Sequence, residues 1–262
     1  MTEVRIEIDV AAAVNDEAVL GACLRRSPDV ASRTMRLRTY VGYETAGSAY
    51  NRALDEATAD YLVLAHQDVY LPDGALTRLR DEIAKLNALD PSWAVAGPIG
   101  LDTQNELRGQ VWSSALKRVI GERLATPVRS ICLDELLLVV RRASGVRFDE
   151  QLPGFHMYGV DIIHIARSHA MNSYVIDLPV VHHSSPVITL SGGYDRAYRY
   201  IRSKWRRSLP IRNLICTVYP TDLWLAWRNV QLKRRHRGLT ERPEPSGDPA
   251  EIARQVGFEE VA

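Results

Sequence analysis

Cysteine is scarce in this chain, and the three cysteines present lie far apart. Cys23, Cys132 and Cys216 form no CxxC pair in 262 residues. This spacing excludes a cysteine zinc cluster and a disulfide scaffold, and it favours a reducing compartment. Long apolar runs are also missing, since none reaches the roughly 18 residues of a membrane span. The acidic start MTEVRIEID has none of the features of a signal peptide. We therefore expect a cytoplasmic location.

Net charge is small for the whole chain but large in its C-terminal third. The formal net charge is +1. Residues 196–237 hold twelve Lys and Arg against the single acid Asp222, so this segment bears +11 and the rest of the chain −10. Such an unmixed basic block indicates an anionic partner, either phosphate, nucleic acid or an acidic membrane surface. The alternative is a solvated helix face.

The order of apolar segments predicts an α/β fold with a mostly parallel sheet and flanking helices. Predicted strands lie within 5–14 and at 36–41, 61–65 and 93–96, and the runs 131–140 and 174–181 are each predicted as one strand. Helices are predicted at 48–59 and 160–169, and around Leu76, Leu79, Ile83 and Leu86, which follow helical spacing. This alternation is typical of α/β domains.

Three segments are predicted from composition. Residues 1–193 form the α/β domain, and 194–240 form a basic helical extension in which Leu223, Trp227 and Val230 share one stripe. Residues 241–262 are polar and rich in proline at their start, which predicts a flexible or weakly structured tail.

Three polar clusters could carry chemistry. His66, Gln67 and Asp68 end an apolar strand, where α/β sheets bind ligands, although an Asp there also caps turns. Asp161 falls in the first turn of a helix, as a general base or as a charge favoured by the helix dipole. His182 and His183 are adjacent on a strand and point to opposite sides, so at most one of them readily faces a site, and a lone His is more often structural than a ligand. One His, one Asp and phosphate oxygens would suit a divalent cation.

The order and spacing of these motifs resemble family 2 glycosyltransferases of the GT-A type, in particular a subgroup with an HQDV motif. Residues 14–17 (VNDE) are similar to the turn after that family's first strand, and 49–53 (AYNRA) with 61–72 are similar to its central metal-binding stretch. The sequences FDE at 148–150 and GVD at 159–161, followed by Arg167, resemble its late acidic motifs, and His182 resembles its late metal-binding His.

The resemblance implies a GT-A fold and a nucleotide-diphosphate-sugar donor, with UDP as the family default. It also implies Mn²⁺ or Mg²⁺, and inverting transfer to a hydroxyl of a glycan, lipid-linked or small-molecule acceptor in polysaccharide or cell-surface glycan synthesis. Asp161 would be the catalytic base, and Asp68 and His182 the metal ligands. The resemblance assigns donor binding to the following residues: Val14, Asn15, Asn51, His66, Gln67 and Lys204.

Departures from the family pattern leave a second reading open. His66 stands where the family has an aspartate, and Val160 where it often has a glutamate. A catalytically silent nucleotide-sugar-binding or assembly subunit is therefore the alternative function. The basic segment 196–237 suits peripheral attachment to the anionic inner face of a membrane, whereas Trp205 and Trp224 could equally be core anchors. No motif that reads nucleic acid is present, so we expect no nucleic-acid partner.

Overall fold

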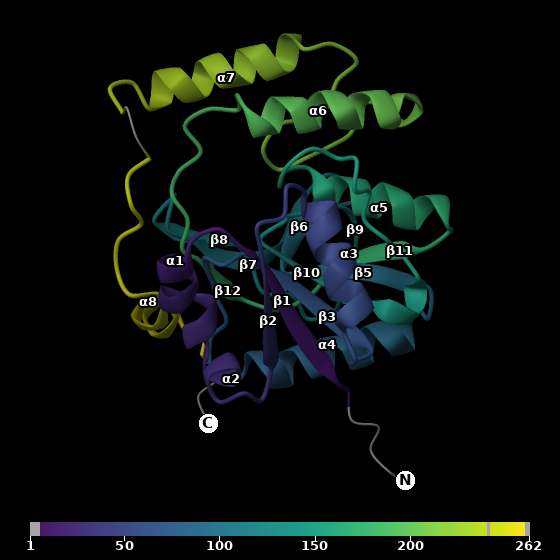
Figure 1. The fold of residues 1–262 in the computed structure, drawn as a ribbon, viewed down its shortest axis with the longest axis vertical. Helices are drawn as coiled ribbons and strands as arrows, with labels where there is room; N and C mark the ends of the chain where they lie inside the picture. Colours follow the sequence, from purple (N-terminus) through teal and green to yellow (C-terminus); the bar gives the residue numbers. More distant parts are fainter. Residues whose placement is uncertain (1–5, 240–241, 260–262) are drawn as a thin grey trace.

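One large sheet runs through the centre of the molecule. The computed structural model describes residues 6–239 and 242–259. In this part of the chain the sheet has 12 strands in the order β2-β1-β3-β10-β5-β11-β9-β6-β7-β12-β4, with β8 paired to β7 (Figure 1).

In the first half of the sheet most strands run parallel to one another, as predicted. Strands β2, β1, β3, β5 and β11 run parallel, and β10 is inserted antiparallel between β3 and β5. The bounds are β2 Arg36–Val41, β1 Ile8–Val14, β3 Tyr61–Ala65, β10 Leu137–Arg141, β5 Trp93–Gly97 and β11 Asn172–Val175.

The second half is mostly antiparallel, and only β12 pairs in parallel, with β7. Its strands are β9 Val128–Leu133, β6 Ile99–Asp102, β7 Leu107–Ser113, β8 Arg118–Gly121, β12 Val180–His182 and β4 Val69–Tyr70. Strands β7 and β8 are not predicted because their half-exposed, mixed residues lack a continuous apolar run, and β6 is not predicted because it has only four residues.

Helices cover both faces of the sheet. Side chains alternate along a strand, so Leu62 and Leu64 pack with α3 (Ala46–Glu56) and α5 (Tyr158–Ser168). Val63 points to the other face, where α1 (Glu17–Ala22), α2 (Pro28–Ala31) and α4 (Ala75–Leu89) pack. The predicted α4 residues Leu76, Leu79, Ile83 and Leu86 are all buried.

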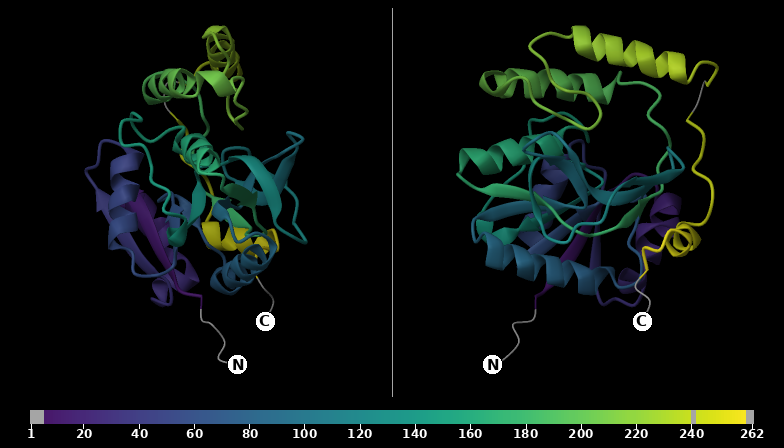
Figure 2. Two further views of the ribbon diagram at one scale, coloured as in Figure 1. Left: turned by 90° about the vertical axis from the view of Figure 1, so that its right-hand side faces the viewer. Right: turned by 180° about the vertical axis from the view of Figure 1, so that it is seen from behind.

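The C-terminal helices lie outside this layered body. Helices α6 (Gly193–Lys204) and α7 (Leu223–Arg235) are stacked beyond α5, with α4 at the opposite end of the molecule (Figures 1 and 2). Short 3-10 turns occur at Leu24–Arg26, Arg142–Ser144 and Arg206–Ser208. None of the helices in the described part of the chain has the length and hydropathy of a membrane span.

The structure corrects two strand predictions. The run 131–140 is divided between β9 and β10 by a turn, in which the Asp134 side chain accepts a hydrogen bond from the Leu136 amide at 3.0 Å. The run 174–181 is likewise divided between β11 and β12. Both turns carry a signal that one continuous strand would lack. Asp134 and Glu135 lie in the first turn, and Asp177 and Pro179 lie in the second.

The predicted tail also differs from expectation. It carries helix α8 (Pro249–Gln255), capped by Asp248, whose side chain accepts from the amides of Ala250 and Glu251. Ile252 and Phe258 are buried against Tyr70 and Val181 of strands β4 and β12. The outer ends of the predicted segments, residues 1–5, 240–241 and 260–262, lie outside the described residues. The α/β fold class with a helical C-terminal extension is confirmed. The prediction of a mostly parallel sheet is wrong, because only four of the strand pairings in the described part of the chain are parallel and seven are antiparallel.

Candidate functional site

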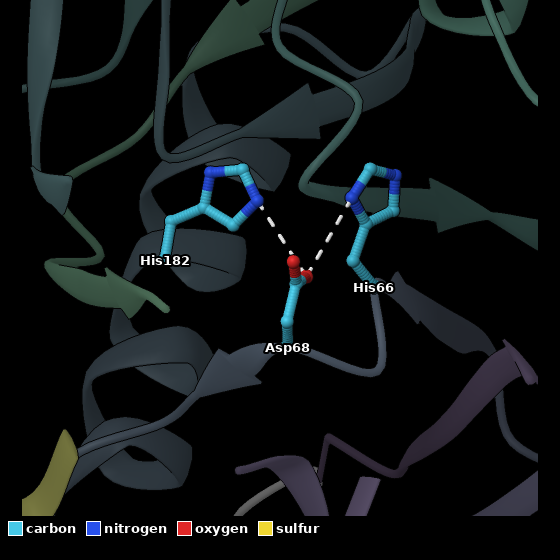
Figure 3. Close-up of side chains that lie close together, drawn as sticks. All are labelled: His66, Asp68 and His182. Atoms are coloured by element: carbon cyan, nitrogen blue, oxygen red, sulfur yellow. Dashed lines mark ion pairs between the residues drawn. The ribbon is translucent and has the colours of Figure 1, made fainter. Parts of the chain in front are cut away.

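Two histidines flank Asp68 where strands β3 and β12 end (Figure 3). His66 and Asp68 lie in the tight turn from β3 to β4, and β4 pairs with β12 so that Val69 is opposite His182. The His183 amide donates to the Asp68 carbonyl at 2.8 Å, which extends this register. The side chains meet as a result: Asp68 Oδ1 lies 3.9 Å from His66 Nδ1 and 3.5 Å from His182 Nε2.

The electrostatics of this triad suit a cation. Asp68 Oδ1 is buried and has no hydrogen-bond partner. Burial alone would raise the pKa of Asp68, but His182 and His66 outweigh it and hold this pKa well below its usual range. Burial lowers the pKa of His66. For His182 the Asp68 carboxylate outweighs burial and raises the pKa.

Tyr158 determines the tautomer of His66, and therefore which ring nitrogen presents its lone pair to Asp68. The Tyr158 hydroxyl donates to the Glu135 carbonyl at 2.8 Å, so its oxygen accepts from His66 Nε2, also at 2.8 Å. Nδ1 of the neutral ring is then unprotonated and directed toward Asp68. An imidazole held through its other nitrogen is the usual arrangement of a metal-ligating histidine. The ligand atoms of His66, Asp68 and His182 all lie within 4.8 Å of one another, so the triad fits a divalent cation.

A cavity of about 380 Å³ opens on one side of the triad. Four of the residues predicted to bind the donor line it together with Asp68: Val14, Asn15, His66 and Gln67. The Gln67 side chain accepts from the amides of Asn15 and Asp16 at 3.0 and 3.1 Å, and so joins the ends of β1 and β3. Aromatic rings complete the wall: Tyr40, Tyr43, Tyr50 and Phe155. We name this space the first cavity.

A second cavity of about 430 Å³ lies on the other side, and His182 lines it. Asp134, from the turn between β9 and β10, is another polar group in its wall. Much of the remaining lining is apolar, and helix α7 contributes Arg228, Leu232 and Arg235. The triad therefore lies at the boundary between the two cavities, with His66 and Asp68 facing the first and His182 the second.

Asp161, the predicted base, is not among the residues that line either cavity. Its side chain is 2% exposed, and Lys204 Nζ lies 2.8 Å from its carboxylate. Trp205 Nε1 donates to Asp161 Oδ1 at 2.7 Å, and Lys204 also binds Asp149 at 2.6 Å. Burial raises the pKa of Asp161, and Lys204 and Trp205 counteract this rise only in part. These contacts fasten the end of α6 to α5.

The structure also places two predicted donor-binding residues elsewhere. Lys204 is engaged in the ion pairs just described. Asn51 is buried in α3 and bonds the 148–150 segment, donating to the Phe148 carbonyl and accepting from the Phe148 amide, each at 2.9 Å. Of the adjacent histidines, His183 turns away from Asp68, with Nδ1 3.0 Å from Ser114 Oγ.

Sequence reasoning missed Tyr158, Asp134 and Glu135. One signal for the last two was available, because an adjacent acidic pair interrupts the apolar run 131–140. An acidic pair in such a run is typical of a turn rather than of one continuous strand. Tyr158 carried no such signal, since its link to His66 joins residues that are 92 positions apart.

Comparison with known proteins gave one sequence relative and several distant structural neighbours. No family model matches the chain. A Fuscovulum blasticum protein named "ATP synthase subunits region ORF 6" is 30% identical over 185 residues, which are 69% of this chain and 73% of that protein.

Three solved structures illustrate the structural neighbours. GalNAc-T7 with UDP, GalNAc and Mn²⁺ matches 98% of this chain, which spans 57% of that one, with 11% identity and a TM-score of 0.48. The mannosyltransferase PcManGT of Pyrobaculum calidifontis with GDP-Man and Mn²⁺ matches 96% of this chain and 79% of its own, at 11% identity and a TM-score of 0.49. S. aureus TarS 1-349 with UDP-GlcNAc matches 76% of this chain and 66% of its own, at 13% identity and a TM-score of 0.46.

The Fuscovulum blasticum protein is similar enough in sequence to show the family of this chain. Its name describes a reading frame in a genomic region and states no activity. At this identity and coverage, the chain belongs to the family of the Fuscovulum blasticum ORF 6 protein.

Proposed function

We propose that this protein is a glycosyltransferase that moves a sugar from a nucleotide-diphosphate donor to an acceptor hydroxyl, with inversion and with a divalent cation. One observation carries the proposal: an unpartnered, buried carboxylate oxygen between two imidazoles lies at the boundary of two cavities. A transferase needs this arrangement, because donor and acceptor must approach one centre from different sides. The motif resemblance to family 2 glycosyltransferases supports the same activity.

The first cavity is the proposed donor site. Its volume of about 380 Å³ falls in the range of small-molecule pockets, which is about 300 to 1,000 Å³. Tyr40 and Tyr43 offer ring faces on which a nucleobase could stack. Asn15 and Gln67 supply polar side chains along the edge that leads to Asp68, and Val14 lines the same edge. UDP remains the default nucleotide from the family resemblance.

His66, Asp68 and His182 would hold the cation. A bound divalent ion supplies neutralisation of the charge that develops on a departing diphosphate. Two imidazoles and one carboxylate are a softer donor set than the all-oxygen shell that Mg²⁺ prefers, so we expect Mn²⁺ to be the better ion. The chain's own contribution is to keep His66 oriented through Tyr158.

The second cavity is the proposed acceptor site. Apolar side chains from the sheet and from the 184–187 loop form much of its wall, and α7 places Arg228 and Arg235 at it. This lining suits an acceptor with an apolar part and an anionic group, as in a lipid-linked glycan. We further propose that residues 1–193 are the catalytic unit and that 194–240 hold it at the anionic inner face of a membrane.

Helix α7 supports the membrane proposal. Leu223, Trp224, Trp227 and Val230 are exposed on it, and the two tryptophan rings stack at 4.5 Å. Exposed aromatic and aliphatic side chains beside a run of Lys and Arg are typical of helices that lie on anionic membranes. Trp205, in contrast, bonds Asp161 and is a core anchor.

Calorimetric titration with UDP, GDP, TDP and CMP, each with Mn²⁺ and with EDTA, tests the proposal. We expect one nucleotide to bind with Mn²⁺ and to lose most of its affinity in EDTA. Binding of none of the four would contradict a nucleotide-sugar enzyme, and equal binding in EDTA would contradict the metal site.

A nucleotide-sugar-binding subunit without activity is the second candidate function. The observation that favours it is the engagement of Asp161 with Lys204, which leaves the predicted base without access to either cavity. Nucleotide binding without release of nucleoside diphosphate from a bound donor would support this candidate. Turnover of the donor would exclude it.

A further inference from the structure

We propose that Glu135, and not Asp161, accepts the proton of the attacking hydroxyl; this assignment rests on the proposed glycosyl transfer. Four observations carry it: the place of Glu135 beside the triad, the space it occupies at the start of α5, the small cavity it lines next to the second cavity, and its lack of a cationic partner.

Hydrogen bonds hold Glu135 one residue away from the triad. The Tyr158 hydroxyl, which bonds His66, also donates to the Glu135 carbonyl, each at 2.8 Å. The Gly159 amide donates to Glu135 Oε1 at 3.0 Å. Gly159 lies in the first turn of α5, where the helix dipole favours a carboxylate. The backbone of Glu135 is thus fixed beside the triad through Tyr158, and its side chain is fixed at the N-terminus of α5.

Glu135 occupies the space that a side chain at residue 159 would need. A Cβ built on Gly159 would lie 2.8 Å from Glu135 Cγ, closer than real Cβ contacts. The sequence motif GVD therefore carries no side chain at its first position because a carboxylate from another element fills that place. Gly159 has an ordinary helical backbone, so the glycine is not required by the backbone conformation.

Glu135 lies next to the proposed acceptor site. It lines a water-sized cavity of about 30 Å³ together with Asp134, Leu214 and Ile215, and these three residues also line the second cavity. The two spaces therefore adjoin. Asp161 lines neither of them.

The surroundings of Glu135 make its carboxylate a base near neutral pH. Among the described residues no ion pair includes Glu135. The titratable groups around it are acidic or neutral: Asp134, Tyr50, Tyr158, Tyr194 and Cys132. Burial raises the pKa of Glu135 to about 8, and Asp134 adds to the rise against the amides of Gly159 and Met157. A general base works best when its pKa is close to the operating pH.

The proposed step balances as follows. The acceptor oxygen forms a bond to C1 of the sugar, and the bond from C1 to the diphosphate oxygen breaks, with its electron pair on the diphosphate. The acceptor proton moves to the carboxylate of Glu135 and later to solvent. Water can replace the acceptor in the same step, which gives free sugar and nucleoside diphosphate.

Glu135→Gln tests the assignment, with Glu122→Gln at a largely exposed position as the matched control. Release of nucleoside diphosphate is measured with UDP-glucose, UDP-N-acetylglucosamine and GDP-mannose, each with Mn²⁺ and with water as acceptor. We expect Glu135→Gln to lose about 100-fold or more in rate at unchanged donor affinity. Wild-type rates in this variant would overturn the assignment alone. Failure of the wild type to bind any nucleotide would instead overturn the proposed function, and the assignment with it.

A second measurement needs no turnover. The amide ¹⁵N shift of Gly159 reports the ionisation of Glu135 through their hydrogen bond, so it should titrate with a midpoint near the pKa of about 8. This titration should vanish in Glu135→Gln. A midpoint near the ordinary glutamate value of about 4.3 would overturn the assignment.

A double variant separates catalysis from structure. Gly159→Asp alone should clash with Glu135, whereas Glu135→Ala with Gly159→Asp moves a carboxylate into the vacated space. We expect the double variant to release nucleoside diphosphate at least about tenfold faster than Glu135→Ala alone. A folded double variant without recovery would contradict the requirement for a carboxylate at this point.

Discussion

At the scale of single residues, the adjacent histidines His182 and His183 make different contacts because side chains alternate along a strand. His182 faces Asp68 and lines the second cavity, whereas His183 turns to Ser114. Their side chains point to opposite sides of one strand end. The pair therefore provides a test of the metal site in which composition, position and exposure are closely matched.

We predict that His182→Ala abolishes Mn²⁺-dependent nucleotide binding and that His183→Ala retains it within a few fold. Removing one of three ligands leaves too few donors to hold the ion. Calorimetry with Mn²⁺ and with EDTA measures both variants. A similar loss in the two would show that the effect is on folding, and retention in His182→Ala would exclude it as a ligand.

The buried Asp161 should behave as a structural residue. Asp161→Asn leaves Lys204 with Asp149 as its remaining carboxylate partner, so we expect a loss of about 2 to 3 kcal/mol in the free energy of unfolding. Urea denaturation measures this loss. Donor hydrolysis per folded molecule should stay within a few fold of the wild type, and a 100-fold loss without destabilisation would restore Asp161 as the base.

At the scale of elements, a helix in the tail supports the strands that hold the triad. Helix α8 packs Ile252 onto strands β4 and β12, which adjoin Asp68 and carry His182, and Phe258 joins the same cluster. Arg26 pairs with Asp248 at 2.7 Å at the start of this helix. The segment predicted as a tail thus supports the two strands next to the His66, Asp68 and His182 triad.

We predict that Phe258→Ala weakens Mn²⁺ binding about tenfold, on the scale of other losses of support around a metal site. The cavity left in a buried cluster should release α8, so protease cleavage within 242–259 should accelerate. The exposed variant Leu89→Ala on α4 is the control. Faster cleavage with unchanged Mn²⁺ affinity would show that α8 does not brace the site.

The second element-scale prediction concerns α7. Replacing Trp224 and Trp227 by Ala should reduce binding to phosphatidylglycerol vesicles by at least about tenfold, because both exposed rings lose their contact with the interface. The remaining attraction should weaken with salt. Co-sedimentation measures both effects, with phosphatidylcholine vesicles and Leu89→Ala as controls. If the double variant binds the vesicles as tightly as the wild type does, the two tryptophans do not contact the membrane.

At the scale of the whole molecule, one buried carboxylate joins three neighbouring strands. Asp9 in β1 binds Arg36 of β2 at 3.0 Å. It also accepts from the amides of Thr58 and Ala59, just before β3, at 2.9 and 3.3 Å. Burial alone would raise the pKa of Asp9, but Arg36 and the two amides lower it overall.

Asp9 should contribute to acid stability. Because its folded-state pKa lies below the unfolded value, its stabilisation is full above that value and is lost as pH falls toward the folded pKa. We predict that Asp9→Asn lowers the free energy of unfolding by about 1 to 3 kcal/mol at neutral pH. The stabilities of the variant and the wild type should converge as the pH falls below the folded-state pKa of Asp9. Urea titrations at several pH values measure this, and a difference that is constant with pH would refute it.

Local patterns were sufficient for much of the fold. Strands β2 and β3 have the predicted bounds, and the predicted stripe of α4 is buried. Strands β7 and β8 lack a distinct hydropathy pattern because they are half-exposed, and β6 has only four residues. The acidic pair Asp134 and Glu135, in contrast, is a local signal for the turn that divides the run 131–140. The helical spacing of Leu223, Trp227 and Val230 is confirmed in α7. Their exposure could not be predicted, because it depends on which elements pack against the helix.

For the site, local sequence is sufficient to predict the strand-end polar residues, because an apolar strand followed by His66, Gln67 and Asp68 places them at a ligand-binding edge. The distant groups that join them follow from tertiary contacts. His182 reaches Asp68 through the pairing of β4 with β12, Lys204 removes Asp161 from the cavities, and Glu135 takes the space beside Gly159. Each of these depends on contacts between segments far apart in the chain, which local periodicity does not encode.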